Sequence, residues 1–422
     1  MQHSQRGVVQ ATCSRHKGHA SYEGKKHMKR SRRGFGCHGA AASNVVFRLV
    51  ALMGVVMGSV GDPFSTLNLP EVSTNRCSDF DLSGLANAMT CGAPLSPPCF
   101  DFSRCRDGPT VYVYDQECSL ADSNPLKNHG LDAAFWYAAK EAGVLADTYE
   151  SACVFINVDF YQQQPCATTA PLWNGGRNHV MFDNFDESRD KRPSYSGSYA
   201  IEASTGQHTC YYRSGYDISV GHYPKVVFHG LQLVPPDHRR YFLTFRGTLH
   251  LKFHGSEERA SILGLHDDTK GVIVAQKCAD QASKWHPDAA DMCAEVLARY
   301  HAYDYNLLMN TTFGLVPAGA SPGTYRLPEV MSAGCIPVFV SRDYVKPFPE
   351  EVNWSSFSFT FAPDEVPDML RTLQSVPPEK LKQMQTKSLD AYWKVYGGKK
   401  DYSMMARHVI DILVKRIGHH GS

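Results

Sequence analysis

The chain has 422 residues, enough for two domains. Its 43 Lys and Arg residues nearly balance its 42 Asp and Glu residues, so its charge gives no indication of nucleic-acid binding. The aromatic content of 11% and apolar content of 43% are those of an ordinary folded protein, which excludes a largely disordered chain.

The N-terminal region combines a basic cluster with a short apolar run. The run extends from Val45 to Val60 and is interrupted only by Arg48. It is short for a membrane span, and residues 49–60 have the length of a signal-peptide core. The charges ahead of it predict a cytoplasmic N-terminus and a lumenal remainder. We therefore expect a disordered tail over 1–43 and a signal anchor over 44–61, with a cleaved signal peptide as the alternative. The basic cluster consists of Lys25, Lys26, Lys29, Arg30, Arg32 and Arg33.

Residues 62–98 are rich in Ser, Pro, Asn and Gly, which is typical of a stem. Most of the cysteines follow the apolar run, where a lumenal compartment would permit disulfides. The sequence has no C-x-x-C pair, which disfavours a zinc or redox site. Cys335 lies in the apolar run AGCIPV and is expected to be a buried free thiol. Two tripeptides, beginning at Asn310 and Asn353, are candidate glycan acceptors.

From Thr110 onward, short β-branched or aromatic runs alternate with helical patterns. Strands are predicted at 110–115, 153–160 and 179–185, and an amphipathic helix over 131–144 carries Leu131, Phe135, Ala138 and Ala139 on one stripe. A second series of strands follows at 241–247, 271–276, 312–317 and 335–340. Helices are predicted at 378–396 and 402–417. This alternation predicts the α/β class, with two Rossmann-like halves over 99–235 and 236–418. The boundary is expected near the Pro-containing segment from Gln232 to Arg240.

The segment from Asn306 to Ser341 resembles a strand, a glycine-rich loop, a helix and a second buried strand. Phe313–Val316 is the first apolar run, and residues 317–323 have turn chemistry. Pro328 suits the first position of a helix that ends at Gly334, and 336–340 would be the next strand. A flexible loop that leads into a helix N-terminus can bind an anion. Arg326 could bind phosphate and Glu329 could bind ribose hydroxyls. The alternative is an ordinary βαβ unit.

Six ordered blocks of the chain resemble the exostosin-type glycosyltransferases, family GT47, which include the heparan sulfate polymerases and their plant and algal relatives. The blocks extend from about residue 91 to about 415. They are CFDFSRC followed by VYVYD, SACVFINVD, LWNGGRNHVMF, YDISV, YFLTFRGTLH and the segment 306–341.

The resemblance implies a GT-B fold, with two Rossmann-like domains that face a cleft and a terminal helix that crosses back to the first domain. It also implies an inverting, UDP-sugar-dependent transferase in the Golgi lumen, anchored as a single-pass type II membrane protein. The expected acceptor is a glycan or polysaccharide. No metal or other cofactor is required, and a homo- or hetero-oligomer with another glycosyltransferase is an expected partner state. The implied disulfides are Cys91–Cys99, Cys105–Cys153 and Cys278–Cys293.

The same resemblance assigns donor contacts to the second half. Arg246 and Arg259 would reach the diphosphate. The rest of the expected donor site consists of Pro317, Gly319, Tyr325, Arg326 and Glu329. Each arginine has a structural alternative. Arg246 could be a solvated residue at a strand end, and Arg259 could form a surface salt bridge with Glu257 or Glu258. Arg326 and Glu329 could form an internal pair that pins the loop.

Inverting transfer needs a base for the acceptor hydroxyl and stabilisation of the leaving UDP. Candidate bases in the first half are His179, Asp183, Asp217 and also Asp159, each with a structural alternative such as a capped turn or a pair with Arg177. The loop carries Ala318, Ala320 and Ser321 where heparan-type members carry arginines, which disfavours glucuronic acid as donor sugar. The main alternative function is a catalytically silent subunit that supports a partner transferase. The chain has no H-x-E, G-x-S-x-G or P-loop pattern that would favour a non-transferase.

Overall fold

The computed structural model describes residues 90–92, 95–115, 131–159, 166–184, 198–250, 255–279 and 290–418. All of these lie within one unit, Val60–Ser422. The expected cytoplasmic tail and signal anchor, and almost all of the expected stem, lie outside the described residues. Among the helices of the described residues, none has the length and apolar character needed to cross a membrane.

The first sheet is fully parallel, with its strands in the order β1-β2-β3-β4-β5. Its strands read as near-continuous apolar runs, as expected for a parallel sheet that is covered on both faces. Helix α1, Leu131–Glu141, buries Leu131, Phe135, Ala138 and Ala139, which is the stripe predicted from the sequence. The strands are β1 (Val111–Val113), β2 (Val154–Asp159), β3 (His179–Asp183), β4 (Ile201–Ser204) and β5 (Ile218–Ser219).

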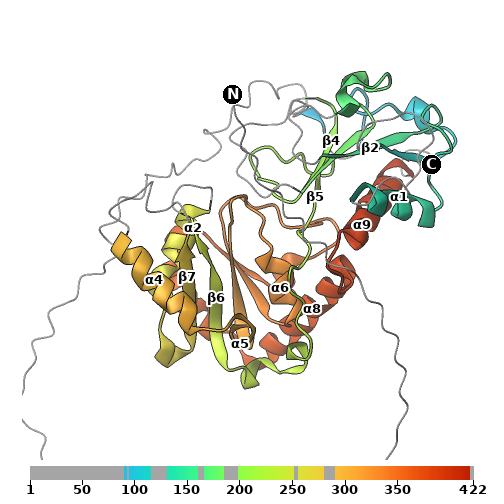
Figure 1. Cartoon of the computed structure of the whole chain (residues 1–422). Coiled ribbons are helices and arrows are strands. Elements are labelled where there is room, and N and C mark those ends of the chain that lie inside the picture. Colours follow the sequence, from blue (N-terminus) through green and yellow to red (C-terminus); the bar gives the residue numbers. More distant parts are fainter. Residues whose placement is uncertain are drawn as a thin grey trace, which may run out of the picture. The chain divides into compact units, whose positions relative to one another are not determined.

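The second sheet is also fully parallel, with its strands in the order β10-β9-β8-β6-β7 (Figure 1). The chain therefore starts at β6, adds β7 on one side, and then returns to add β8, β9 and β10 on the other side. This reversal creates a topological switch point between β6 and β8. The strands are β6 (Tyr241–Leu249), β7 (Val272–Cys278), β8 (Thr311–Pro317), β9 (Ile336–Val340) and β10 (Phe359–Phe361).

Among the described residues, the α-helices of the second half before the last one lie between these strands or follow β10. They are α2 (Ser256–Ser261), α4 (Ala290–Ala302), α5 (Tyr305–Leu308), α6 (Arg326–Ser332), α7 (Val366–Gln374) and α8 (Pro378–Tyr396). The predicted α/β class with two Rossmann-like sheets is confirmed. The chain passes from one sheet to the other between Ser219 and Tyr241, and the expected boundary near Gln232–Arg240 lies within that connection.

Helix α6 begins earlier than the sequence predicts. Pro328 is the third residue of the helix, because Arg326 already has helical hydrogen bonding and Tyr325 is the N-cap. A proline is tolerated throughout the first helical turn, since that turn has no intrahelical partner for its N–H groups. The predicted end is confirmed: Gly334 follows the helix with a φ of +71°, a backbone conformation that favours glycine. Arg326 therefore lies in the first turn together with Glu329.

The last helix, α9 (Ser403–Gly418), returns to the first sheet and packs on α1. Arg407 of α9 forms an ion pair with Glu141 of α1 at 3.4 Å. Arg416 donates hydrogen bonds to the backbone oxygens of Tyr216, at 2.6 Å, and Asp217, at 3.1 Å. The C-terminal end of the chain thus stabilises the region just before β5.

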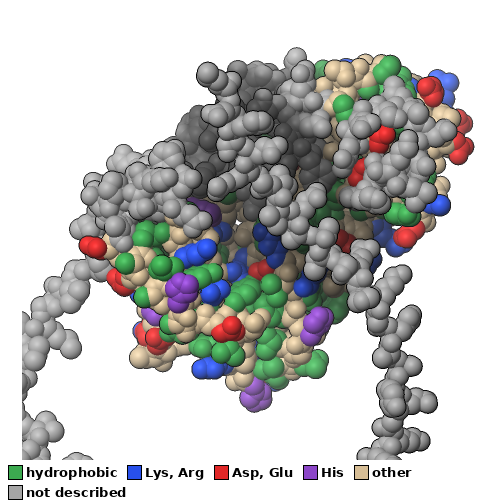
Figure 2. All heavy atoms as spheres, viewed as in Figure 1, with side chains coloured by type: hydrophobic (Ala, Val, Ile, Leu, Met, Phe, Trp, Pro, Cys, Tyr) green, Lys and Arg blue, Asp and Glu red, His purple; other side chains and the backbone are tan. Residues whose placement is uncertain are grey.

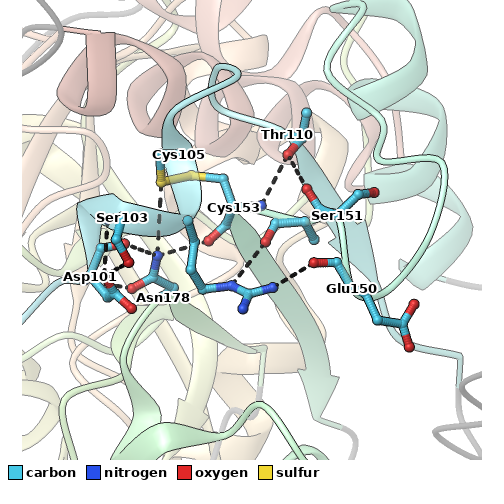
Figure 3. Close-up of a disulfide and its surroundings, with 10 residues drawn as sticks. Asp101, Ser103, Cys105, Thr110, Glu150, Ser151, Cys153 and Asn178 are labelled. Atoms are coloured by element: carbon cyan, nitrogen blue, oxygen red, sulfur yellow. Dashed lines mark hydrogen bonds between the residues drawn. A yellow bond between two sulfur atoms is a disulfide. The ribbon is translucent and has the colours of Figure 1, made fainter.

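The three disulfides implied by the resemblance are all present: Cys91–Cys99, Cys105–Cys153 and Cys278–Cys293. Cys335 is a buried free thiol, as predicted. Figure 3 shows that the Cys105–Cys153 bond lies within a hydrogen-bonded cluster. The amide of Asn178 donates to the backbone oxygens of Asp101, at 2.9 Å, and Cys153, at 2.8 Å. The disulfide and Asn178 together tie residues 101–105 to the start of β2.

We predict that loss of Cys105–Cys153 destabilises the protein more than loss of Cys91–Cys99. The two bonds close segments with sequence separations of 48 and 8 residues. Cross-linking a longer loop removes more entropy from the unfolded chain, and this difference amounts to about 1.5 kcal/mol. Urea unfolding of the Cys105→Ser/Cys153→Ser and Cys91→Ser/Cys99→Ser double variants measures it. Equal losses, or a larger loss for the short loop, would contradict the prediction.

Candidate functional site

The switch point of the second sheet places one loop at the centre of the carboxyl edge. Open parallel sheets bind ligands at this position, because the connections on either side of the switch point leave in opposite directions. Here the loop of residues 318–324 leaves β8 after Pro317 and leads to α6. The end of β6 and the start of α2 border the same loop. The sequence motif predicted as a donor loop therefore lies where the topology favours a ligand.

Two glycines allow the loop to approach its neighbours backbone to backbone. Gly255 donates a hydrogen bond from its N–H to the oxygen of Gly319 at 2.7 Å. A Cβ atom at Gly255 would lie 2.3 Å from the oxygen of Ala318, and one at Gly323 would lie 2.1 Å from the oxygen of Thr205. Neither position has room for a side chain. Because Thr205 directly follows β4, the loop contacts the carboxyl edge of the first sheet as well as its own.

Arg259 joins the two strands on either side of the switch point. Its Nε donates to the oxygen of Ala318 at 2.8 Å, and its Nη1 donates to the oxygen of Thr248 on β6 at 2.5 Å. The side chain is only 7% exposed. Arg259 is thus a buried residue, and its two hydrogen bonds hold the loop against β6. Its guanidinium also lies beside Gly319, 3.3 Å from where a Cβ of that residue would be.

Arg326, Glu329 and Tyr305 form a partly buried polar cluster at the start of α6. Arg326 and Glu329 form an ion pair at 3.3 Å. The Tyr305 hydroxyl donates to Glu329 and accepts a hydrogen bond from Arg326, which also donates to the backbone oxygen of Arg246. Burial lowers the pKa of Arg326 and raises that of Glu329, and each partner partly offsets the other's shift. These contacts match the internal Arg326–Glu329 pair that was the structural alternative predicted from the sequence.

Arg246 lies on the other side of this cluster and stacks on an aromatic ring. Its guanidinium carbon is 3.7 Å from the centroid of the Tyr300 ring, and its Nε donates to the Tyr300 oxygen at 3.4 Å. Among the described residues Arg246 forms no ion pair. Because its guanidinium stacks on Tyr300 and the residue is half-buried, Arg246 is not freely solvated. Figure 2 shows Lys and Arg side chains gathered over the upper parts of β6 and β7 as these are seen in Figure 1.

Sequence reasoning missed Tyr300 and Tyr305. Both contact arginines of the site, Tyr300 from α4 and Tyr305 from α5. The only sequence signal was the tyrosine-rich run RYHAYDYN just before the recognised segment. A tyrosine ring can stack on a guanidinium while its hydroxyl takes part in a polar cluster, which makes both residues useful beside arginines.

Tyr325, the predicted donor residue ahead of α6, is surrounded by residues that follow β5. Its ring stacks on His222 at 4.3 Å, and the Nζ of Lys225 lies 3.6 Å from its centroid. Burial lowers the pKa of His222 to about 3, so this ring is neutral at physiological pH. Phe228 donates from its N–H to the Ser332 hydroxyl at 3.2 Å. The connection between the two sheets thus runs along α6 and supports Tyr325.

Two of the candidate bases lie at the edge of the first sheet opposite the carboxyl edge. His179 is the first residue of β3; its Nε2 is hydrogen-bonded to the Tyr114 hydroxyl at 3.0 Å and its Nδ1 to the oxygen of Arg177 at 2.9 Å. Asp217 precedes β5, and Arg213 donates to its two carboxylate oxygens at 2.6 and 2.9 Å. The partner of Asp217 is therefore Arg213 and not Arg177. Both residues have the contacts of structural groups.

Asp183 has a different position, because it ends β3 at the carboxyl edge. It is buried, and its backbone oxygen accepts a hydrogen bond from the N–H of Thr205 at 3.2 Å. Asp159 ends β2 and is paired in register with Asp183. Of the candidate bases, these two lie on the side of the sheet that the loop approaches. No group of three or more His, Cys, Asp or Glu side chains suited to hold a metal ion occurs within the described ranges.

Two parallel Rossmann-like sheets, with a loop at the switch point of the second, form the GT-B arrangement. The chain matches the Exostosin GT47 domain over residues 106–376, from just before β1 to just after α7, and it belongs to this exostosin family.

Several relatives show the extent of this similarity. The chain is 28% identical to Exostosin-1 of Drosophila melanogaster over 337 residues, which cover 71% of this chain and 42% of that protein. It is 28% identical to Exostosin-2 of Bos taurus over 323 residues, which cover 71% and 43%. It is 23% identical to the Exostosin-1 homolog of Caenorhabditis elegans over 358 residues, which cover 76% and 88%. The chain thus spans about two-fifths of the first two relatives.

Solved structures give weaker similarities. One is described as trehalose-6-phosphate from E. coli bound with UDP-2-fluoro glucose; it has a TM-score of 0.37 and 12% identity and covers 67% of this chain and 76% of its own. Another, the glycosyltransferase AviGT4 involved in avilamycin A biosynthesis, has a TM-score of 0.31 and 14% identity and covers 63% and 69%.

We predict that His179→Gln changes the pH dependence of stability and leaves sugar transfer within a few-fold of the unsubstituted chain. Burial lowers the pKa of His179 to about 4, below its ordinary value of 6.5. The unfolded chain then binds the proton more tightly, so this contribution is complete above pH 6.5 and is lost as the pH falls towards 4. It amounts to about 3 kcal/mol. Urea unfolding between pH 7 and 4.5 should show a smaller loss for the variant. Loss of transfer in a folded variant would restore His179 as a base candidate.

Proposed function

We propose that this protein transfers a sugar from a UDP-sugar to a glycan or polysaccharide acceptor with inversion of the anomeric centre. The observation that carries the proposal is that Arg259 and Arg326 contact the loop at the β6–β8 switch point and that Arg246 lies beside Arg326. Membership of the exostosin family supports the same chemistry. The sugar donor would bind with its diphosphate at this edge of the second sheet.

The electrostatics of the cluster favour a bound diphosphate. Arg246 lies close enough to Arg326 to contribute to the lowering of its pKa, so two guanidinium groups repel each other in a partly buried place. Glu329 supplies one negative charge in return. A diphosphate would offset the remaining positive charge and would accept charge-assisted hydrogen bonds. The same arginines would stabilise the charge that develops on UDP as it leaves, so the proposed mechanism needs no resident metal.

Asp183 is our candidate for the base that removes the proton from the acceptor hydroxyl. It adjoins Thr205, whose backbone oxygen in turn lies against Gly323 of the donor loop. Through these contacts, Asp183 of the first sheet would approach the donor. The acceptor would bind between Asp183 and the donor. Glu329 would bind the ribose hydroxyls by exchanging part of its contact with Tyr305.

We further propose a lumenal location, with the chain anchored in the Golgi membrane by residues 44–61. Three disulfides in the described residues fit an oxidising compartment. Of the two glycan acceptors, Asn353 is exposed, and the Ser355 hydroxyl donates to its side-chain oxygen at 2.8 Å. The Thr312 hydroxyl of the other tripeptide is buried and donates to Pro236. Asn353 is therefore the better acceptor. An oligomer with another glycosyltransferase would suit the same compartment.

A panel of UDP-sugars, with release of UDP as readout and oligosaccharides as acceptors, tests the proposed activity. We expect acceptor-dependent UDP release with one class of donor. The uncharged loop residues Ala318, Ala320 and Ser321 favour a donor with a neutral sugar over UDP-glucuronic acid. UDP binding without transfer on any donor would contradict the proposed activity. Absence of UDP binding would overturn the proposed donor site and support the alternative, a silent subunit, which the mutual pairing of Arg326 and Glu329 favours.

We predict that Arg246→Ala weakens UDP affinity by about 10- to 100-fold, the value of a charge-assisted hydrogen bond. The fold should remain intact, because Arg246 has no ion pair among the described residues. Calorimetric titration with UDP measures the change, and Arg371→Ala is the control, since Arg371 forms an exposed surface pair with Asp368. Unchanged affinity in a folded Arg246→Ala protein would contradict the assignment. Arg326→Ala should also weaken binding, but by leaving Glu329 unpaired it should lower stability as well.

A further inference from the structure

Lys277 lies on the same face of the second sheet as Arg246, one strand farther from the switch point. Its register partner on β6 is Thr248, which lies two residues after Arg246. Residues two apart on a strand face the same side, so Arg246, Thr248 and Lys277 share one face near the carboxyl edge. Lys277 is half-buried there.

Both cations face the same aromatic ring. The Arg246 guanidinium is 3.7 Å from the centroid of Tyr300, and the Lys277 Nζ is 6.0 Å from it. The two charges are therefore no farther apart than the sum of these distances. A disulfide between Cys278 and Cys293 joins the residue after Lys277 to α4, the helix that carries Tyr300 two turns later. This covalent link limits how far Lys277, on β7, can move from Tyr300, on α4.

Among the described residues, no carboxylate balances the positive charge that faces the Tyr300 ring. Within the described ranges, neither Arg246 nor Lys277 takes part in an ion pair. On the other side of Arg246 lies Arg326, whose guanidinium donates to the Arg246 backbone oxygen and is paired with Glu329. Among the described residues, three cations thus follow one another along the sheet edge, and Glu329 is the carboxylate paired with one of them. Such an edge attracts an extended anion rather than a single point charge.

We infer that Lys277 is a further donor-binding residue, which contacts the diphosphate of the nucleotide from the β7 side while Arg246 and Arg326 contact it from the β6 and β8 sides. The ligand class is a nucleoside diphosphate, and the inference rests on the proposed donor site. Tyr300 acts as the spacer that sets the separation of Lys277 and Arg246. The disulfide is a positioning element, because it fixes the strand end relative to α4.

The test compares UDP with uridine on the full-length protein by calorimetric titration. Lys277→Ala should weaken UDP binding by about 10-fold, the equivalent of one charge-assisted contact, and should leave uridine affinity within about twofold. Lys277→Arg should restore most of the UDP affinity, because it keeps the charge. Lys382→Ala is the matched control: Lys382 is an exposed lysine on α8 paired with Glu379, and its loss should change neither affinity.

Two results would overturn the inference. UDP affinity of Lys277→Ala equal to that of the unsubstituted protein would make Lys277 a solvated surface cation. Equal losses for UDP and uridine would place it against the base instead of the phosphates. Failure of the unsubstituted protein to bind UDP at all is a different outcome, because it would remove the proposed donor site on which Lys277 depends.

Discussion

The close backbone packing of residues 318–323 is the constraint on which the site depends. Gly255 and Gly323 lie against carbonyl oxygens at distances that exclude a side chain. Arg259 then closes the gap between this loop and β6 with two buried hydrogen bonds. Gly255 belongs to the second half, whereas Thr205, whose oxygen lies against Gly323, follows β4. The loop is therefore held by both sheets. Its position therefore couples the donor edge to the candidate base at Asp183.

The remaining chemistry follows from how positive charge is distributed around this rigid loop. Arg259 is committed to carbonyl groups and Arg326 to Glu329 and Tyr305, so neither is a simple exposed phosphate ligand. Arg246 and Lys277 are held by Tyr300 and have no carboxylate partner among the described residues. Arg259 thus holds the loop, whereas the proposed diphosphate contacts come from Arg246, Lys277 and the paired Arg326. The cations next to Tyr300 carry the charge that a diphosphate would meet.

In the first sheet too, some candidate residues have structural contacts, whereas others lie at the edge where a ligand could bind. His179 and Asp217 occur in motifs that resemble the family, yet each lies at the amino end of a strand with its polar atoms engaged by neighbouring groups. Such groups fix the register of the sheet. Asp183 and Asp159 lie at the opposite ends of β3 and β2. Open parallel sheets bind ligands at the carboxyl ends of their strands, which is where Asp183 and Asp159 lie.

The sequence by itself determined the α/β class, most strands, the end of α6 and the buried thiol, because these follow from local periodicity and turn chemistry. The disulfide pairing came from family resemblance. Strand order and long-range contacts depend on the tertiary structure, because local sequence patterns do not encode them. The order β10-β9-β8-β6-β7 placed the loop at a switch point. Contacts across more than twenty residues joined Tyr305 to Glu329 and Lys277 to Tyr300. Strand direction, and not residue type, separated Asp183 from Asp217, since these two aspartates lie at opposite edges of the first sheet.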